Sequence, residues 1–183
     1  MIPTEAVPLK PIVLELAKKV YRELGSFGYV EEKVFERALA QEFRRNGLSY
    51  LEQVPVDILY EGHVVLRGVV DFIVFDREER EGLLLELKAQ TKPDGAWIHQ
   101  IVKYYEALTS EESTFPRFIV ERIRGGVILN WTVDSAQKGM LVEELGGRVF
   151  EEREQAEMER LREKIGAIEV YNLRLEKTRE EGP

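Results

Sequence analysis

Three apolar segments in a row, joined by connections too short to hold a helix, constrain the fold of this chain most. They cover residues 52–60, 63–76 and 83–89. Glu61-Gly62, between the first two, predicts a tight hairpin turn, and we expect a bend at Gly68 in the second segment. The third follows a charged loop at 77–82. Strands joined this closely pair antiparallel, so the segments predict a three-stranded meander.

Apolar residues at helical spacing predict helices on either side of the meander. The expected ranges are 9–24, 30–45 and 95–108. The second helix has an apolar stripe expected to be buried, formed by Val34, Phe35, Ala38, Leu39 and Phe43. Asn46-Gly47 ends that helix as a C-cap, and residues 126–131 form a short buried strand. The order αβββαβ predicts an α/β fold, with a mixed central sheet flanked by helices.

The last third of the chain has a weaker pattern. We expect a helix at 135–145, a turn at Gly146-Gly147, a charged helix at 150–165 and a final strand at 167–175. The narrow apolar stripe of the charged helix suits a lid or a partner surface, so a homodimer is possible. The domain hypothesis is one domain over 1–183. It has a core at 24–131 and a C-terminal α/β extension at 132–183 whose role stays open.

Composition narrows the chemistry. With no cysteine, disulfides, thiolate metal sites and cysteine nucleophiles are excluded, and two histidines disfavour a zinc centre. The net charge of −8 argues against strong nonspecific attraction to nucleic acid, although a bound cation and a locally basic groove can offset it. No stretch approaches the roughly 20 apolar residues of a membrane span, and no secretory signal is visible. We therefore expect a cytoplasmic protein without a membrane partner.

Charged residues interrupt two of the apolar strands. Because side chains alternate, Leu84, Glu86 and Lys88 share one face of the third strand. Asp71 is a lone carboxylate in the second strand. The residues expected on its face are Val69, Ile73 and Phe75, with Val70, Phe72 and Val74 on the other. If these strands pair, Asp71 and Glu86 converge at one end of the sheet.

Two converging carboxylates repel each other, and a divalent cation relieves that repulsion. Oxygen ligands without sulfur suit Mg²⁺ or Mn²⁺, and Lys88 could face a phosphate or the attacking water. This arrangement fits metal-assisted phosphodiester hydrolysis. The alternative is that Glu86 and Lys88 form a structural salt bridge or lie on a solvated sheet face.

Glu32 is a third acidic candidate. It extends the inward stripe of the second helix, through Phe35 and Leu39, and could reach the same cleft. Its alternative role is a favourable acid in the first turn of a helix. We expect its neighbours Glu31 and Glu36 to be surface residues.

Asp71, followed by Glu86-Leu87-Lys88 on the next strand, resembles the D…(D/E)-x-K signature of the PD-(D/E)XK nuclease superfamily. The closer likeness is to its GxxExxY subgroup. It lies in "GYVEEKVFERAL", "LLLELKA", "HQIVKYYEAL" and "GVILNW", which occur in the subgroup's order. Two details depart from the subgroup's motif. Phe35 stands where the motif has tyrosine. The motif's spacing from its glycine, Gly28, places its glutamate at Glu31, whereas the rest of the motif aligns its glutamate with Glu32.

The resemblance implies a restriction-endonuclease-like fold and a metal-dependent nuclease acting on nucleic acid, with DNA as the expected substrate. The implied metal ligands are Asp71, Glu86, the Leu87 carbonyl and Glu32, and Lys88 would assist the nucleophile or the transition state. Gln100 and Tyr104 would bind substrate. The alternative function is a non-catalytic nucleic-acid-binding or dimeric assembly protein that keeps this fold. The residues leave open DNA or RNA, single or double strand, and internal or terminal cleavage.

Overall fold

The computed structural model describes residues 8–24, 31–89, 96–131, 141–146 and 168–174. These residues form a six-stranded sheet in the order β1-β2-β3-β4-β6-β5. The strands are β1 Tyr50–Tyr60, β2 His63–Phe75, β3 Gly82–Lys88, β4 Ile123–Trp131, β5 Leu141–Gly146 and β6 Ile168–Arg174. The helices are α1 Leu9–Leu24, α2 Glu32–Arg45, α3 Ala96–Thr109 and the short α4 Arg117–Val120. The αβββαβ order expected from the sequence is confirmed.

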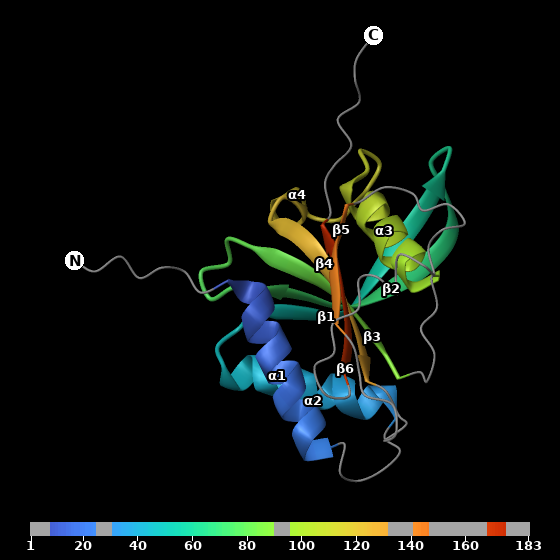
Figure 1. Cartoon of the computed structure of the whole chain (residues 1–183). Helices are drawn as coiled ribbons and strands as arrows, with labels where there is room; N and C mark the ends of the chain where they lie inside the picture. The colour runs from blue at the N-terminus through green and yellow to red at the C-terminus, as the bar shows by residue number, and fades with distance from the viewer. Residues whose placement is uncertain (1–7, 25–30, 90–95, 132–140, 147–167, 175–183) are drawn as a thin grey trace, which may run out of the picture.

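Helices cover both faces of the sheet (Figure 1). α1 and α2 pack on one face, in an apolar cluster that includes Leu39, Phe43 and Leu85. α3 packs on the other face, in a cluster that includes Leu84 and Ile101. Adjacent leucines of β3 thus belong to opposite layers, as the alternation predicted. This leaves Glu86 on a strand that is buried from both sides.

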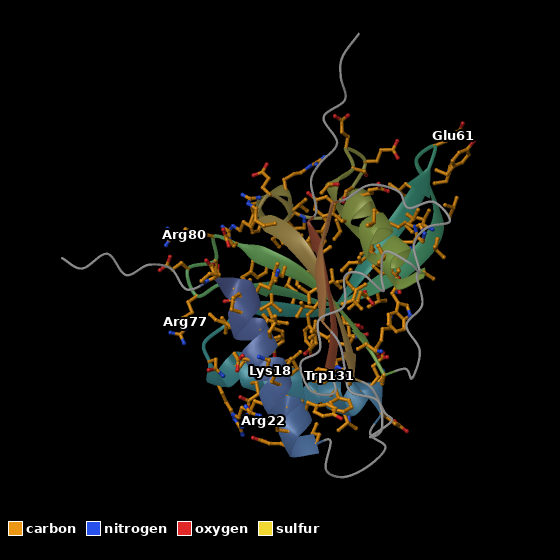
Figure 2. All side chains as sticks on the ribbon, viewed as in Figure 1. Lys18, Arg22, Glu61, Arg77, Arg80 and Trp131 are labelled. Atoms are coloured by element: carbon orange, nitrogen blue, oxygen red, sulfur yellow. The ribbon has the colours of Figure 1, made fainter. Side chains whose placement is uncertain are left out.

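The β1–β2 hairpin has the expected turn but an unexpected irregularity. Glu61 and Gly62 have φ values of 49° and 76°, and Figure 2 shows Glu61 at the hairpin's outer end. The register shifts between Ile58, which pairs with Leu66, and Leu59, which pairs with Val64. Val65 is therefore the extra residue of a β-bulge.

The hairpin is regular at Gly68, where a bend was predicted, because Gly68 pairs with Val56 in the continuous ladder. The irregularity lies at Val65 instead. Gly68 has another structural role. A Cβ atom there would lie 2.2 Å from Cε1 of Tyr104 on α3. The glycine gives the tyrosine ring room to lie directly on the strand.

The predicted side-chain alternation along β2 is wrong at Asp71. Val70 belongs to the α3-side cluster, whereas Phe72 belongs to the α1/α2-side cluster, although these residues are two apart. The opposite residue on β1 is Gln53, between the pairs Glu52–Phe72 and Val54–Val70, and its φ is 51°. The left-handed backbone of Gln53 reverses the sheet face to which the side chains after it on β1 point. The pairing register with β2 stays the same on both sides of it. The change of face coincides with the lone carboxylate.

α2 and its ends follow the sequence with one correction. Phe35, Leu39 and Phe43 are buried, but Val34 is 41% exposed. Val34 precedes Phe35 in the first turn, so its side chain is rotated away from the buried stripe. Gly47 takes a positive φ of 69° after the helix, and the Leu48 N–H donates to the Phe43 carbonyl, as expected of this C-cap.

The predicted helix at 135–145 is wrong over 141–145, which belong to β5. β5 runs parallel to β6, so backbone hydrogen bonds in the sheet override a helical composition. The predicted strand at 167–175 is confirmed as β6. The helix expected at 150–165 and the first part of the 135–145 segment lie outside the described residues. Within the described chain, no helix has both the length and the apolar character needed to cross a bilayer.

Candidate active site

Asp71 and Glu86 come together where the β2–β3 ladder ends. The ladder ends at the pair Phe72–Leu85. Asp71, just before Phe72 on β2, and Glu86, just after Leu85 on β3, are the next residues beyond that end. The Leu87 N–H donates to Oδ2 of Asp71 at 2.7 Å, which joins the strands beyond that pair. Burial raises the pKa of the Asp71 carboxyl, and the Leu87 N–H opposes that rise. The predicted convergence of the two carboxylates is therefore present.

Glu86 is the most deeply buried of these acids, with 1% of its surface exposed. Lys88 Nζ donates to its Oε2 at 3.3 Å, so the alternative salt bridge does form. Oε1 is buried and has no hydrogen-bond partner among the described residues. Burial, followed by the charge of Asp71, raises the pKa of Glu86 to about 8, against the opposing attraction of Lys88. One lysine thus leaves half of this carboxylate unsatisfied.

Glu32 reaches the same place from the first turn of α2. Its carboxyl lies near the Lys88 ammonium and the Ala89 backbone, just beyond β3, and both favour its charged form. Burial is the main cause that raises its pKa, and the charge of Asp71 adds to the rise. A solvated first-turn acid would not show this environment. The structure brings Glu32, Asp71, Glu86 and Lys88 together.

Glu36 and Gln53 are two site neighbours that the sequence reasoning missed. Glu36 was expected at the surface, but burial and the nearby charge of Asp71 raise the pKa of its carboxyl. Gln53 Nε2 donates to Glu36 Oε1 at 2.7 Å and to Asp71 Oδ1 at 3.4 Å. One helical turn separates Glu36 from Glu32, and this spacing was the available signal for Glu36.

Gln100 and Tyr104, the predicted substrate-binding pair, lie on α3. Gln100 Nε2 donates to the Tyr104 hydroxyl at 3.1 Å. Tyr104 is part of the α3-side core cluster, where its ring faces Gly68. Gln100 is half-buried and remains the more accessible of the two. Their contact with each other is present, and their role toward a substrate stays a prediction.

The donor set fits a hard divalent cation, although the neighbouring acids do not form a compact metal-binding group among the described residues. The described residues contain no tight group of at least three histidine, cysteine, aspartate or glutamate side chains that could hold a metal. Glu86 nevertheless has a buried oxygen without a partner, and Asp71 and Glu32 add negative charge beside it. A divalent cation would satisfy that oxygen and offset the repulsion among the acids.

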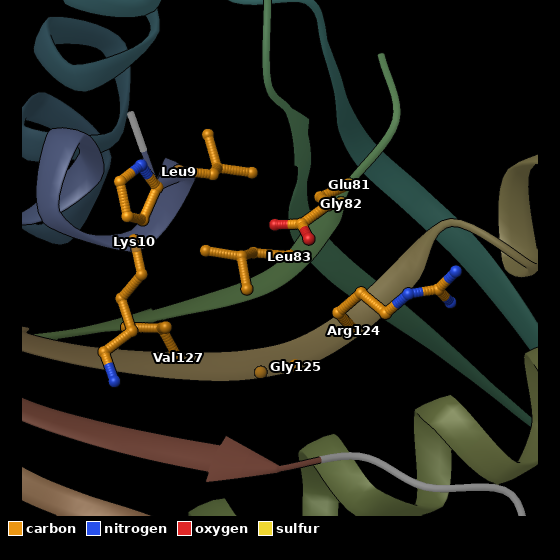
Figure 3. A pocket seen from close by; sticks show the side chains of 10 residues that line it. Leu9, Lys10, Glu81, Gly82, Leu83, Arg124, Gly125 and Val127 are labelled. Atoms are coloured by element: carbon orange, nitrogen blue, oxygen red, sulfur yellow. The ribbon is translucent and has the colours of Figure 1, made fainter. Parts of the chain in front are cut away.

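A separate pocket of about 170 Å³ lies at the opposite end of β3 (Figure 3). It is lined by Glu81, Gly82 and Leu83 at the start of β3, by Lys10 of α1, and by Arg124 to Val127 of β4. None of the predicted site residues lines it. The carboxylate site and this pocket are therefore distinct places on the same strand.

No curated protein matches the sequence at a significant level. Residues 8–140 match the sequence profile of the PD-(D/E)XK nuclease superfamily. This match spans both acidic strands, Lys88 and α3, and it accords with the observed αβββαβ core, which is restriction-endonuclease-like. The closer likeness to the GxxExxY subgroup stays a prediction. With most of its length matched, the chain belongs to the PD-(D/E)XK nuclease superfamily.

Proposed function

We propose that this protein is a divalent-metal-dependent nuclease that hydrolyses phosphodiester bonds, with DNA as the proposed substrate. The observation that carries the proposal is the buried Glu86 carboxylate. It has an unpartnered Oε1, Asp71 and Glu32 beside it, and Lys88 on its other oxygen. A purely structural ion pair would need neither the additional acids nor the unsatisfied oxygen.

Each residue has a proposed role. Asp71, Glu86, the Leu87 carbonyl and Glu32 would hold Mg²⁺ or Mn²⁺. When bound, the cation would help activate water and neutralise charge developing on the phosphate. The Lys88 ammonium would donate a hydrogen bond to a phosphate oxygen during the attack. Glu32 would accept a hydrogen bond from the attacking water. The oxygen of that water would form the new bond to phosphorus as the bond to the leaving sugar oxygen breaks, with the water's proton passing to Glu32 and the leaving oxygen taking a proton from solvent.

Lys88 is well placed for such a role. Its side chain is 16% exposed, so the ammonium lies at the edge of the buried site rather than in open solvent. A charge in that position interacts more strongly with a phosphate than one in bulk water does. The Glu86 carboxylate holds it there in the absence of substrate. Gln100, half-buried on α3, is proposed to contact the nucleic acid.

The test is cleavage of labelled single- and double-stranded DNA and RNA, with Mg²⁺, Mn²⁺ or EDTA. Wild type is compared with Lys88→Ala and Asp71→Ala, after circular dichroism has shown that both variants are folded. Metal-dependent cleavage that both variants lose by a factor of at least about 100 is expected, as for other groups that stabilise transition-state charge. If RNA is cut in preference to DNA, the substrate assignment changes while the nuclease stands.

The opposite result has a definite meaning. No cleavage of any of these substrates, with no calorimetric binding of Mn²⁺ by wild type, would overturn the proposal. Glu86 and Lys88 would then be a structural pair in a non-catalytic nucleic-acid-binding or dimeric assembly protein. A filter-binding assay on the same substrates and sedimentation of the protein would distinguish those two functions.

A further inference from the structure

We propose that Gln53 is a positioning residue of this nuclease site, holding the Asp71 carboxylate in place and fastening α2 to it through Glu36. The inference rests on the proposed function and adds a residue to the site. Gln53 comes from β1, a strand to which the sequence reasoning assigned no part of the chemistry.

The first support is the set of hydrogen bonds around Asp71. Its Oδ2 accepts from the Leu87 N–H at 2.7 Å, and its Oδ1 accepts from Gln53 Nε2 at 3.4 Å. With one donor on each oxygen, the plane of the carboxylate is restrained from two strands at once. Outer donors of this kind commonly orient carboxylates that bind metals.

The second support is the link to α2. The same Gln53 Nε2 donates to Glu36 Oε1 at 2.7 Å. An amide nitrogen has two hydrogens and carries no charge, so it can bridge two carboxylates without neutralising either. Glu36 is one helical turn from Glu32, whose carboxyl lies near Lys88 and Asp71. The bridge therefore fixes the part of α2 from which Glu32 extends.

The third support is the backbone of Gln53. Its φ of 51° lies in the left-handed region, which glycine and asparagine adopt more readily than glutamine. The strand pairs normally on both sides, through Glu52–Phe72 and Val54–Val70. Unfavourable backbone conformations persist where they place a functional group. Here the left-handed residue lies directly opposite Asp71, and its amide reaches that carboxylate.

Replacing Gln53 by glycine tests the contribution of the side-chain amide separately from that of the left-handed backbone. Gln53→Gly removes the side chain and its hydrogen bonds but accepts the positive φ without strain, so the variant should remain folded, which urea unfolding checks. The matched control is Glu61→Gly, a positive-φ residue (49°) in the hairpin turn, away from the carboxylates. Gln53→Asn is a second variant, because asparagine tolerates this φ but is one methylene shorter.

The measurements are the dissociation constant for Mn²⁺ by calorimetry, and kcat and KM for the preferred nucleic acid. Gln53→Gly and Gln53→Asn should bind Mn²⁺ about 10–100-fold more weakly, the usual effect of losing an outer-shell donor. kcat at subsaturating Mn²⁺ should fall by a similar factor and recover in part at high Mn²⁺, while KM for nucleic acid stays near wild type. Glu61→Gly should match wild type in every value.

A metal-free readout tests the contacts themselves. In ¹H–¹⁵N spectra, the side-chain amide pair assigned to Gln53 should shift in Asp71→Asn and in Glu36→Gln, and remain unchanged in Glu61→Gly. Unshifted signals in both carboxylate variants would overturn the bridge.

The role of Gln53 and the nuclease proposal can fail separately. An active wild type, with folded Gln53→Gly and Gln53→Asn equal to it in Mn²⁺ affinity and kcat, would refute the role of Gln53 alone. A wild type that neither binds Mn²⁺ nor cleaves would refute the nuclease, and the positioning role with it.

Discussion

At the scale of single residues, the electrostatics of the site centre on Glu86. The charges of Asp71 and Glu32 act on it directly, Glu36 interacts with Asp71 beside it, and burial raises the pKa of each of these three acids. The charge of Lys88 acts to lower the pKa of Glu86, Asp71 and Glu32. One ammonium cannot neutralise all three carboxylates. Without a cation, the least costly way to relieve the repulsion is to protonate Glu86, whose pKa is raised to about 8.

This raised pKa predicts that the metal-free protein loses stability as the pH rises. Between the ordinary carboxyl pKa of 4.5 and about 8, the folded protein holds a proton on Glu86 that the unfolded chain releases. That contribution is complete below pH 4.5 and is lost as the pH passes about 8. The slope is at most about 1.4 kcal/mol per pH unit.

The measurement is urea unfolding in EDTA from pH 5 to pH 9, comparing wild type with Glu86→Gln. The amide does not titrate, so wild type should lose stability relative to the variant across this range. Parallel pH profiles for the two proteins would show that the pKa of Glu86 is not raised.

At the scale of elements, the β-bulge in the β1–β2 hairpin explains why Gln53 was missed. Counting back from the Glu61-Gly62 turn without a bulge places Gln53 opposite Val70, not Asp71. The extra residue, Val65, moves the pairing by one position and brings Gln53 to the carboxylate. Neither the bulge nor the left-handed Gln53 has a signal in the hydrophobic pattern, because valine and glutamine are both ordinary strand residues.

The contact between β2 and α3 gives a second prediction. Gly68→Ala places a Cβ atom 2.2 Å from the Tyr104 ring, which is buried and held by Gln100. The ring must move, at a cost of about 1–3 kcal/mol of unfolding free energy in urea. The same substitution in a Tyr104→Ala background should cost much less. An equal loss in both backgrounds would attribute the effect to the strand itself rather than to the ring.

The contact between α1 and α2 gives a third prediction. Glu42 is buried and accepts hydrogen bonds from Lys19 Nζ at 2.7 Å and Arg45 Nη1 at 3.0 Å. Glu42→Ala should lower the unfolding free energy by about 1–2 kcal/mol, a reduced figure because Arg45 is exposed and Lys19 is partly exposed. Glu15→Ala removes the exposed pair with Lys18 and should cause no measurable loss in the same urea experiment. Equal effects would mean that burial of Glu42 contributes nothing.

At the scale of the whole molecule, the sequence predicted what depends on strong periodicity. The meander, the helices on both faces, and the convergence of Asp71, Glu86 and Glu32 follow from regular spacing and hairpin connections. The strand at 141–146 did not follow, because its helix-forming composition is overridden by pairing with β6, a partner distant in the sequence. Glu36 was missed because its environment depends on how α2 is oriented over β1 and β2, which helical spacing alone does not determine.

The whole molecule should also respond to metal through the same carboxylates. Divalent cation must displace the proton on Glu86 below pH 8, so Mn²⁺ affinity should rise about tenfold per pH unit from pH 6 to pH 7.5 and level off above 8. Binding at pH 7 should release close to one proton per ion, measured by calorimetry in buffers of different ionisation enthalpy. Since the ion binds only the folded state, saturating Mn²⁺ should also raise Tm.

Glu86→Gln and Asp71→Asn are the variants that identify the source of this response, and Glu61→Gly is the matched control. Both carboxylate variants should lose the rise in Tm, and Glu86→Gln should also lose the steep pH dependence of any residual binding. Mn²⁺ affinity that is flat from pH 6 to pH 8 in wild type would mean that Glu86 is already ionised in the metal-free protein. Lys88 would then hold the Glu86 carboxylate charged more effectively than its single 3.3 Å contact indicates.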